Sequence, residues 1–177
     1  PEHLDFHGNM NDYYNSKRKL FKKLNSDKIA IINIDDRYGE KICTSTNAKI
    51  ITYGMTKKAD LYPVNINLSL KGIEANLMYK NDVIKIESSL IGQYNLENIM
   101  ASIAACIRMD ISINKIEKSI KSMPLIPGRM EQIHCDSPGK IFIDYAHTPD
   151  AYEKLFYNIS KLINKNDKII SVFGCGG

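Results

Sequence analysis

Residues 29–36 read Ile-Ala-Ile-Ile-Asn-Ile-Asp-Asp, and this stretch indicates the fold class. It is an almost unbroken apolar run that ends on Asp35 and Asp36. Such a run is typical of a strand buried on both faces, as the strands of parallel sheets are. Because parallel strands are joined by crossover connections, most often helices, the stretch predicts an α/β fold.

The chain before this run predicts an amphipathic helix. Within residues 9–24, apolar side chains recur at steps of three and four residues, and Asn9 is placed to cap the helix. The stripe consists of Tyr13, Tyr14, Leu20, Phe21 and Leu24. After the run, residues 49–53 predict a second strand. The β-rich residues 61–90 are split at Lys71-Gly72 and Asn81-Asp82, which favours a small antiparallel sheet.

The second half of the chain predicts two helices, a break and a further α/β unit. The helices are expected over residues 96–107 and 113–123, and the break at Pro124 and Pro127-Gly128 is the preferred domain boundary. Beyond it we expect a strand over residues 140–144, a helix over residues 149–163 capped by Thr148, and a strand over residues 169–173.

Composition excludes several classes of protein. The 177 residues are 44% hydrophobic and 25% charged, which is typical of a folded globular chain. The net charge of +4 is small and the basic residues are scattered, so no nucleic-acid partner is expected. No apolar run approaches the roughly 18 residues needed to span a bilayer, and the first residues do not resemble a signal peptide. We therefore expect a cytoplasmic protein without membrane insertion.

The cysteines and the last residues of the sequence lead to two further predictions. Four cysteines without a Cys-x-x-Cys pair predict neither a zinc site nor a disulfide framework. The chain ends on Phe173-Gly174-Cys175-Gly176-Gly177, a glycine-rich turn of the kind that leads into a further element. We therefore expect an internal piece of a longer protein.

Lys17 is the most informative single position. On a helical wheel it falls in the middle of the apolar stripe of residues 9–24, so it is expected to be partly buried. Burial favours the neutral amine, which can attack a carbonyl, form a Schiff base or capture carbon dioxide as a carbamate. The alternative is a lysine whose stem packs while its amine reaches water.

Two other groups have both a functional and a structural interpretation. His3, Asp5 and His7 form a compact set of imidazole and carboxylate groups that suits a divalent metal, or they decorate the surface. Asn95 and Asn98 lie three residues apart at the start of a helix. Their amides offer the donor and acceptor that the edge of an adenine ring requires, although Asn95 could equally cap the helix.

Residues 144–150 read Asp-Tyr-Ala-His-Thr-Pro-Asp and run from a strand into a helix N-terminus. Open α/β sheets bind ligands at such places, and the free N–H groups there favour an anion. Asp144 could accept from ribose hydroxyls and His147 could donate to a phosphate. Arg129 could reach a nucleotide between two domains, or it could be a surface arginine. A G-x-x-x-x-G-K-[ST] loop is absent from these 177 residues, so this chain alone is not expected to cradle a triphosphate.

Taken in order along the chain, six stretches resemble motifs of the Mur ligases, the ATP-dependent amino-acid ligases of peptidoglycan synthesis. They are His3-Leu4-Asp5-Phe6-His7-Gly8, Tyr14-Asn15-Ser16-Lys17, Asn33-Ile34-Asp35-Asp36, Gly92-Gln93-Tyr94-Asn95-Leu96-Glu97-Asn98, Pro127-Gly128-Arg129-Met130-Glu131 and Ile143-Asp144-Tyr145-Ala146-His147-Thr148-Pro149-Asp150. The last two resemble most the ligases that complete UDP-N-acetylmuramoyl-tripeptide. The resemblance implies that residues 1–126 are the C-terminal part of the ATP-binding central domain. Residues 127–177 would begin a Rossmann-like C-terminal ligase domain that binds the amino acid.

The resemblance also implies roles for single residues. His3 would be a magnesium ligand, and Lys17 would be carbamylated so that it supports a second magnesium beside the transferred phosphate. The nucleotide would be bound by Asn95 and Asn98 at adenine, by Arg129 and Asp144 at ribose and phosphate, and by His147 close to the phosphates. ATP and Mg²⁺ are thus the implied cofactors.

The implied reaction is the addition of meso-diaminopimelate or L-lysine to UDP-MurNAc-L-Ala-D-Glu through an acyl phosphate, by a monomeric enzyme. Two alternatives stay open at this point. One is a related ligase such as folylpolyglutamate or cyanophycin synthetase, and the other is a non-catalytic nucleotide-binding fragment. Because the P-loop is missing from these 177 residues, the chain alone is expected to be inactive.

Overall fold

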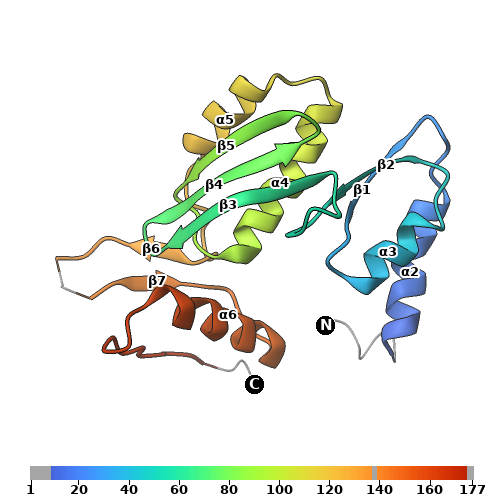
Figure 1. Ribbon diagram of the computed structural model, residues 1–177. Helices are drawn as coiled ribbons and strands as arrows, with labels where there is room; N and C mark the ends of the chain where they lie inside the picture. The colour runs from blue at the N-terminus through green and yellow to red at the C-terminus, as the bar shows by residue number, and fades with distance from the viewer. Residues whose placement is uncertain (1–8, 137–138, 175–177) are drawn as a thin grey trace.

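The computed structural model describes residues 9–136 and 139–174, and Figure 1 shows a sheet flanked by helices, followed by a separate hairpin and a last helix. The elements of the first part are α2 (Met10–Lys22), β1 (Ile29–Asn33), α3 (Arg37–Cys43), β2 (Lys49–Tyr53), β3 (Leu61–Ser69), β4 (Gly72–Tyr79), β5 (Asp82–Ser88), α4 (Gln93–Arg108) and α5 (Ile113–Lys121). The second part consists of β6 (Glu131–Ile133), β7 (Ile141–Ile143) and α6 (Pro149–Leu162). The α/β fold class predicted from the sequence is confirmed.

The parallel and antiparallel strands belong to one mixed sheet with the order β1-β2-β3-β4-β5. β1 and β2 pair in parallel along their whole length, whereas β2 and β3 meet only where Tyr53 pairs with Leu61. β3, β4 and β5 form the antiparallel meander that the sequence predicts. A separate two-stranded antiparallel sheet pairs β6 with β7.

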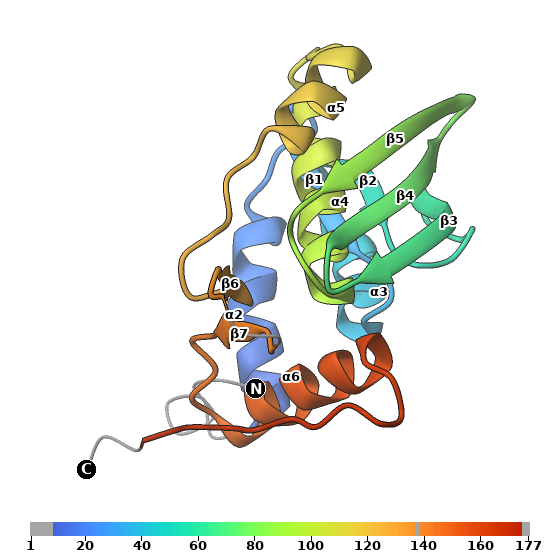
Figure 2. The same ribbon diagram turned by 90° about the vertical axis from the view of Figure 1, so that its left-hand side faces the viewer.

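β1 is buried on both faces, as its apolar run predicts. Ala30 and Ile32 point into a core with Ile42 of α3, whereas Ile31 packs against the larger core beneath α4. That larger core includes the fully buried Leu96. Figure 1 shows α4 on one side of β1 and β2 and the helices α2 and α3 on the other, and Figure 2 shows α5 beside β5. Because successive side chains of β1 point to opposite faces of the sheet, this strand contributes to the hydrophobic core on each face.

α2 forms where the sequence predicts a helix, but it packs through a different face. The Asn9 side chain caps it by accepting hydrogen bonds from the backbone N–H groups of Asn11 and Asp12, at 2.9 and 3.0 Å. Tyr14, Phe21 and Leu24 pack against the core of β1 and α3, whereas Leu20 is 64% exposed.

The prediction that Lys17 is partly buried is therefore wrong, because Lys17 is exposed. Residues 14, 18 and 21 share the face that contacts the sheet, and residues 13, 17 and 20 lie one position, or about 100°, further round the helix. Tyr14 belongs to the first of these faces and Tyr13 to the second, so the sequence offers an aromatic residue on each. The pattern alone therefore did not decide which face packs.

The C-terminal part differs from its prediction at one strand. Residues 169–173 form no strand in this structure, and Ile170 and Val172 are 88% and 95% exposed. An apolar run becomes a strand only where a neighbouring strand accepts its backbone hydrogen bonds, and none of the described strands pairs with it. The hairpin of β6 and β7 contains the expected strand around residue 142, and Thr148 caps α6 with its hydroxyl 3.3 Å from the N–H of Ala151. The domain boundary after residue 126 stays a prediction.

Candidate functional site

The start of α4 is shaped by Gly92, which has a φ of +92° that favours glycine. A Cβ on Gly92 would lie 3.0 Å from Cε1 of the Tyr94 ring, so the glycine also makes room for that ring. Gly92 is the N-cap residue of α4 and provides no side-chain cap. The alternative interpretation of Asn95 as the helix cap is therefore wrong.

Asn95 is 2% exposed and is the one buried polar residue in the described core. Its Nδ2 donates to the carbonyl oxygen of Ile91 at 2.8 Å, which fixes the amide against the backbone that enters α4. Asn98, one turn further along, is exposed. Their predicted contact with adenine stays a prediction, and the buried position of Asn95 allows it only through atoms that this hydrogen bond leaves free.

Asp144 connects the segment before β6 to the segment after β7. Its Oδ2 accepts from the N–H of Met130 at 2.9 Å, and its Oδ1 accepts from the N–H of Ala146 at 2.9 Å. Gly128 adds a third link, because its carbonyl accepts from the N–H of Tyr145 at 2.8 Å. Gly128 and Met130 both have positive φ, at 68° and 48°, so the turn between them is tight. Arg129 projects from this turn and is exposed.

His147 lies three residues after Asp144 and is exposed. Its Nδ1 is 2.9 Å from the carbonyl oxygen of Tyr145. A carbonyl can only accept, so we assign the proton of the neutral ring to Nδ1, which leaves Nε2 as an acceptor. When the ring is protonated, Nε2 donates, as contact with a phosphate would require.

Tyr94 is the residue at this site that the sequence did not single out. Its hydroxyl oxygen is buried and has no hydrogen bond of ordinary length among the described residues, although the amide of Asn95 lies near enough to favour its ionised form. Burial raises the pKa of Tyr94 to about 12; the charge of Asp144 acts in the same direction, while Arg129 and the amide of Asn95 oppose it. The charges of Arg129 and Asp144 act on it from 35 and 50 positions away in sequence, which no local pattern reports.

The late ionisation of Tyr94 is directly measurable. In an alkaline titration, replacing Tyr94 by phenylalanine is expected to remove tyrosinate absorbance near pH 12 and none near pH 10. The pKa of Tyr94 is higher in the folded protein than in the unfolded chain. The contribution of Tyr94 to the free energy of unfolding is therefore intact below about pH 10 and is lost as the pH rises towards about 12. Denatured protein is the control, since its tyrosines ionise near pH 10. Loss of absorbance near pH 10 in the folded variant would contradict the structure.

The metal-site prediction falls largely outside the described part of the chain. His3, like Asp5 and His7, lies outside the described residues. Lys17 is exposed on α2, with Nζ 5.4 Å from the centre of the Tyr13 ring. Within residues 9–136 and 139–174 there is no group of three or more His, Cys, Asp or Glu that could hold a metal ion. A carbamate on Lys17 would supply carboxylate oxygens of the kind that Mg²⁺ prefers, but the rest of the ligand set is not described.

The structure thus brings part of the predicted site together. Hydrogen bonds of Asp144 with the N–H groups of Met130 and Ala146 hold the turn that carries Arg129 against the segment that carries His147. Lys17 stands apart, since Figure 1 shows α2 on the far side of the molecule from the β6–β7 hairpin.

Two aspartates of the stretch 29–36 have structural roles. Asp35 accepts from the N–H of Met55 at 2.7 Å, and Asp36 caps α3.

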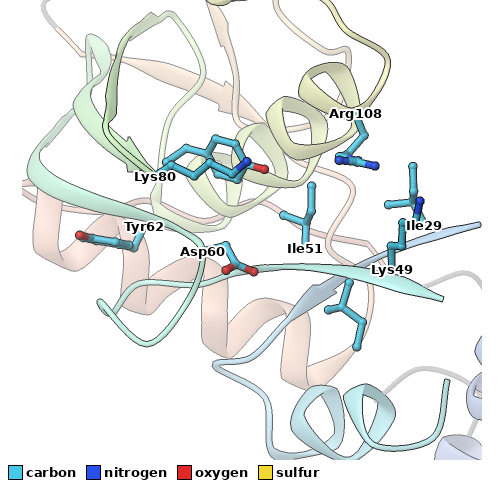
Figure 3. Close-up of a pocket in the computed structure, with 9 residues that line it drawn as sticks. Ile29, Lys49, Ile51, Asp60, Tyr62, Lys80 and Arg108 are labelled. Atoms are coloured by element: carbon cyan, nitrogen blue, oxygen red, sulfur yellow. The ribbon is translucent and has the colours of Figure 1, made fainter. Parts of the chain in front are cut away.

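A hollow of about 400 Å³ lies elsewhere, at the amino-terminal ends of β1 and β2 (Figure 3). Ile29, Lys49 and Arg108 line one part of it and Asp60 and Lys80 another. None of the predicted site residues lines it. Open α/β sheets bind their ligands at the carboxyl ends of the strands, so this hollow is not the candidate site.

Two family models match the chain. The Mur ligase middle domain matches residues 1–106, and the Mur ligase glutamate ligase domain matches residues 128–177. The UDP-N-acetylmuramoyl-L-alanyl-D-glutamate–2,6-diaminopimelate ligase 1 of Clostridium acetobutylicum is 39% identical over 178 residues. That alignment covers 99% of this chain and 36% of the relative, so the chain spans about a third of the length of the curated relatives that it matches.

Solved structures agree with these matches. The structure of a UDP-N-acetylmuramoyl-L-alanyl-D-glutamate–2,6-diaminopimelate ligase superposes with a TM-score of 0.75 and 30% identity, over 90% of this chain and 34% of that one. MurF from Thermotoga maritima, solved in complex with ADP, gives a TM-score of 0.76 over 90% of this chain and 36% of that one, and at 18% identity it supports the fold alone. The resemblance inferred from the six stretches is confirmed, and the chain belongs to the Mur ligase family.

Proposed function

We propose that this chain is part of an ATP-dependent ligase that joins a diamino acid to UDP-MurNAc-L-Ala-D-Glu in peptidoglycan synthesis. The observation that carries the proposal is the alignment of 99% of the chain with ligases named for this substrate and for 2,6-diaminopimelate. Among diamino acids, diaminopimelate is therefore favoured over L-lysine. The domain division proposed is residues 1–126 for the central domain and 127–177 for the C-terminal domain.

The joined segments that carry Arg129, Asp144 and His147 support ATP as the nucleotide. Asp144 uses one lone pair on each oxygen for a backbone N–H, and each oxygen can accept once more, which suits ribose hydroxyls. Arg129 is exposed and forms no salt bridge with a described residue, so its guanidinium is available to a phosphate. His147 offers Nε2 on the same segment, and Asn95 and Asn98 are assigned to adenine.

Magnesium and Lys17 complete the proposed site. Carbamylated Lys17 and His3 would hold Mg²⁺, which when bound offsets negative charge on the phosphates. Lys17 is open to reaction with carbon dioxide, because it is exposed and its amine forms no salt bridge with a described residue. Its proposed role therefore rests on this access and not on a buried neutral amine.

The proposed chemistry has two steps. The terminal phosphoryl group of ATP passes to the carboxylate of D-glutamate, which yields an acyl phosphate and ADP. The amine of the diamino acid then attacks the acyl carbon, phosphate leaves with the C–O bond electrons, and the nitrogen loses a proton. Catalysis of this kind consists mostly of positioning and charge stabilisation, to which a cluster of donors and cations contributes.

The remaining parts of the proposal concern partners and place. We propose a monomer that acts in the cytoplasm, where its nucleotide substrates occur, with no nucleic-acid partner. None of the helices within the described ranges is both long and apolar enough to cross a membrane. The net charge of +4 is too small to favour a polyanion.

The test is release of ADP by the full-length protein. We expect it to require both UDP-MurNAc-L-Ala-D-Glu and meso-diaminopimelate, with the tripeptide product seen by mass spectrometry. Faster turnover with L-lysine would reassign the amino acid, and turnover with folate and glutamate would reassign the enzyme. The 177-residue chain alone is expected to release no ADP, because it lacks a P-loop. Activity of that chain would contradict the proposal for its site.

A further inference from the structure

The hollow at the amino-terminal ends of β1 and β2 carries positive charge that the proposed function does not use. Its volume of about 400 Å³ is typical of a site for a small molecule. Three cationic side chains line it, Lys49, Lys80 and Arg108, and Asp60 is the one carboxylate among the described residues that do so. The lining is therefore suited to an anion.

The three cations come from separate parts of the fold. Lys49 is the first residue of β2, Lys80 follows the end of β4, and Arg108 is the last residue of α4. Figure 3 shows Lys49 and Arg108 at one end of the hollow and Lys80 towards the other. None of the three forms a salt bridge with a described residue. An anion between them would be attracted from both ends.

The neighbouring carboxylates do not neutralise these cations. The Oδ2 atom of Asp60 accepts from the backbone N–H and from the hydroxyl of Thr52, both at 2.8 Å. Asp27, two residues before β1, pairs with Lys28 at 2.8 Å. The positive charge of the hollow is thus left for a ligand.

Lys80 occupies a backbone position that disfavours lysine. With Asn81 it forms the two-residue turn between β4 and β5, and its φ is +54°. In that left-handed region the Cβ crowds a backbone oxygen, so glycine, asparagine and aspartate are favoured in such turns. The Nζ of Lys80 lies 5.5 Å from the centre of the Tyr79 ring, which also lines the hollow. A backbone outlier of this kind indicates a use for its side chain.

We propose that this hollow binds a small anion with two phosphate groups, at a site separate from that of the nucleotide. Lys49 and Arg108 hold one phosphate and Lys80 holds the other, because guanidinium and ammonium groups donate charge-assisted hydrogen bonds to phosphate oxygens. The inference does not depend on the proposed function, since none of the residues assigned to that function lines the hollow.

The test is calorimetric titration of the full-length protein with pyrophosphate and with orthophosphate. Arg108→Gln is expected to weaken pyrophosphate binding about 10- to 100-fold, the effect of one lost charge-assisted hydrogen bond. Orthophosphate should bind at least about 10-fold more weakly than pyrophosphate, because a single phosphate reaches only one end of the hollow. Pyrophosphate binding that is absent, that equals orthophosphate binding, or that Arg108→Gln leaves unchanged would overturn the inference.

Lys80→Asn separates a binding role from a structural one. Asparagine adopts positive φ more readily than lysine, so the thermal midpoint should stay the same or rise while pyrophosphate affinity falls about 10-fold. An unaltered affinity would show that Lys80 serves no ligand and would contradict the two-ended site.

Arg129→Gln is the matched control for Arg108→Gln, because Arg129 is an exposed arginine that does not line the hollow. It should leave pyrophosphate binding unchanged. If Arg129→Gln weakened that binding and Arg108→Gln did not, pyrophosphate would occupy the candidate nucleotide site, and the separate anion site would be wrong.

Discussion

Replacing Lys17 by alanine in the full-length protein is expected to slow ADP release about 100- to 1,000-fold, the usual effect of removing a group that stabilises charge in the transition state. The expected cause is loss of the carbamate beside the transferred phosphoryl group. Added formate or acetate should restore part of the rate, because a free carboxylate can occupy the space of the missing one. The measurement is the steady-state rate of ADP release with both substrates saturating.

The structure makes this a clean test, because Lys17 contributes little to stability. It is exposed, and its described contact is with the Tyr13 ring, worth about 0.5–1 kcal/mol at such a site. The thermal midpoint should therefore change little while activity falls. Lys19→Ala is the matched control, since Lys19 is an exposed lysine on the same helix. Full activity of Lys17→Ala without any added carboxylate would refute the carbamate role.

The sequence predicts most elements of this fold because their patterns are local. The run at residues 29–34 becomes β1, and the periodic segments become α2, α4, α5 and α6. α3 was missed because it is only seven residues long and has a glycine, Gly39, as its third residue. β6 was missed because three residues carry no measurable alternation. The strand expected at residues 169–173 is absent for a different reason. Its apolar pattern is clear, but a strand also needs a neighbouring strand to accept its backbone hydrogen bonds, and none of the described strands does so.

The site was predictable as a set of residue types but not as an arrangement. Asp144 and His147 could be placed at the end of a strand, because the stretch runs from β7 into the capped start of α6. The environment of Lys17 could not be derived, because it depends on which face of α2 meets α3. The burial of the Tyr94 hydroxyl is a property of the folded chain that no local pattern reports.

Gly39→Ala is expected to lower the local free energy of unfolding by about 2–4 kcal/mol, a large value for one methyl group. A Cβ on Gly39 would lie 1.7 Å from the carbonyl oxygen of Asn33 and 2.9 Å from its carbonyl carbon. Both atoms are backbone at the end of β1, so no side-chain rotation can relieve the clash. α3 must move away from β1, which pulls Ile42 from the core and disturbs the Asp36 cap.

Amide hydrogen exchange of the full-length protein measures this effect where it arises. The amides of β1 and α3 should exchange faster by a factor that corresponds to the lost free energy, while those of β4 and β5 change less. Gly174→Ala makes the same chemical change where a Cβ meets nothing within 4 Å, and it should leave exchange unaltered. If Gly39→Ala exchanged like Gly174→Ala, the close approach of α3 to the end of β1 would be wrong. Asp36 and Tyr38 would then not be positioned by that contact.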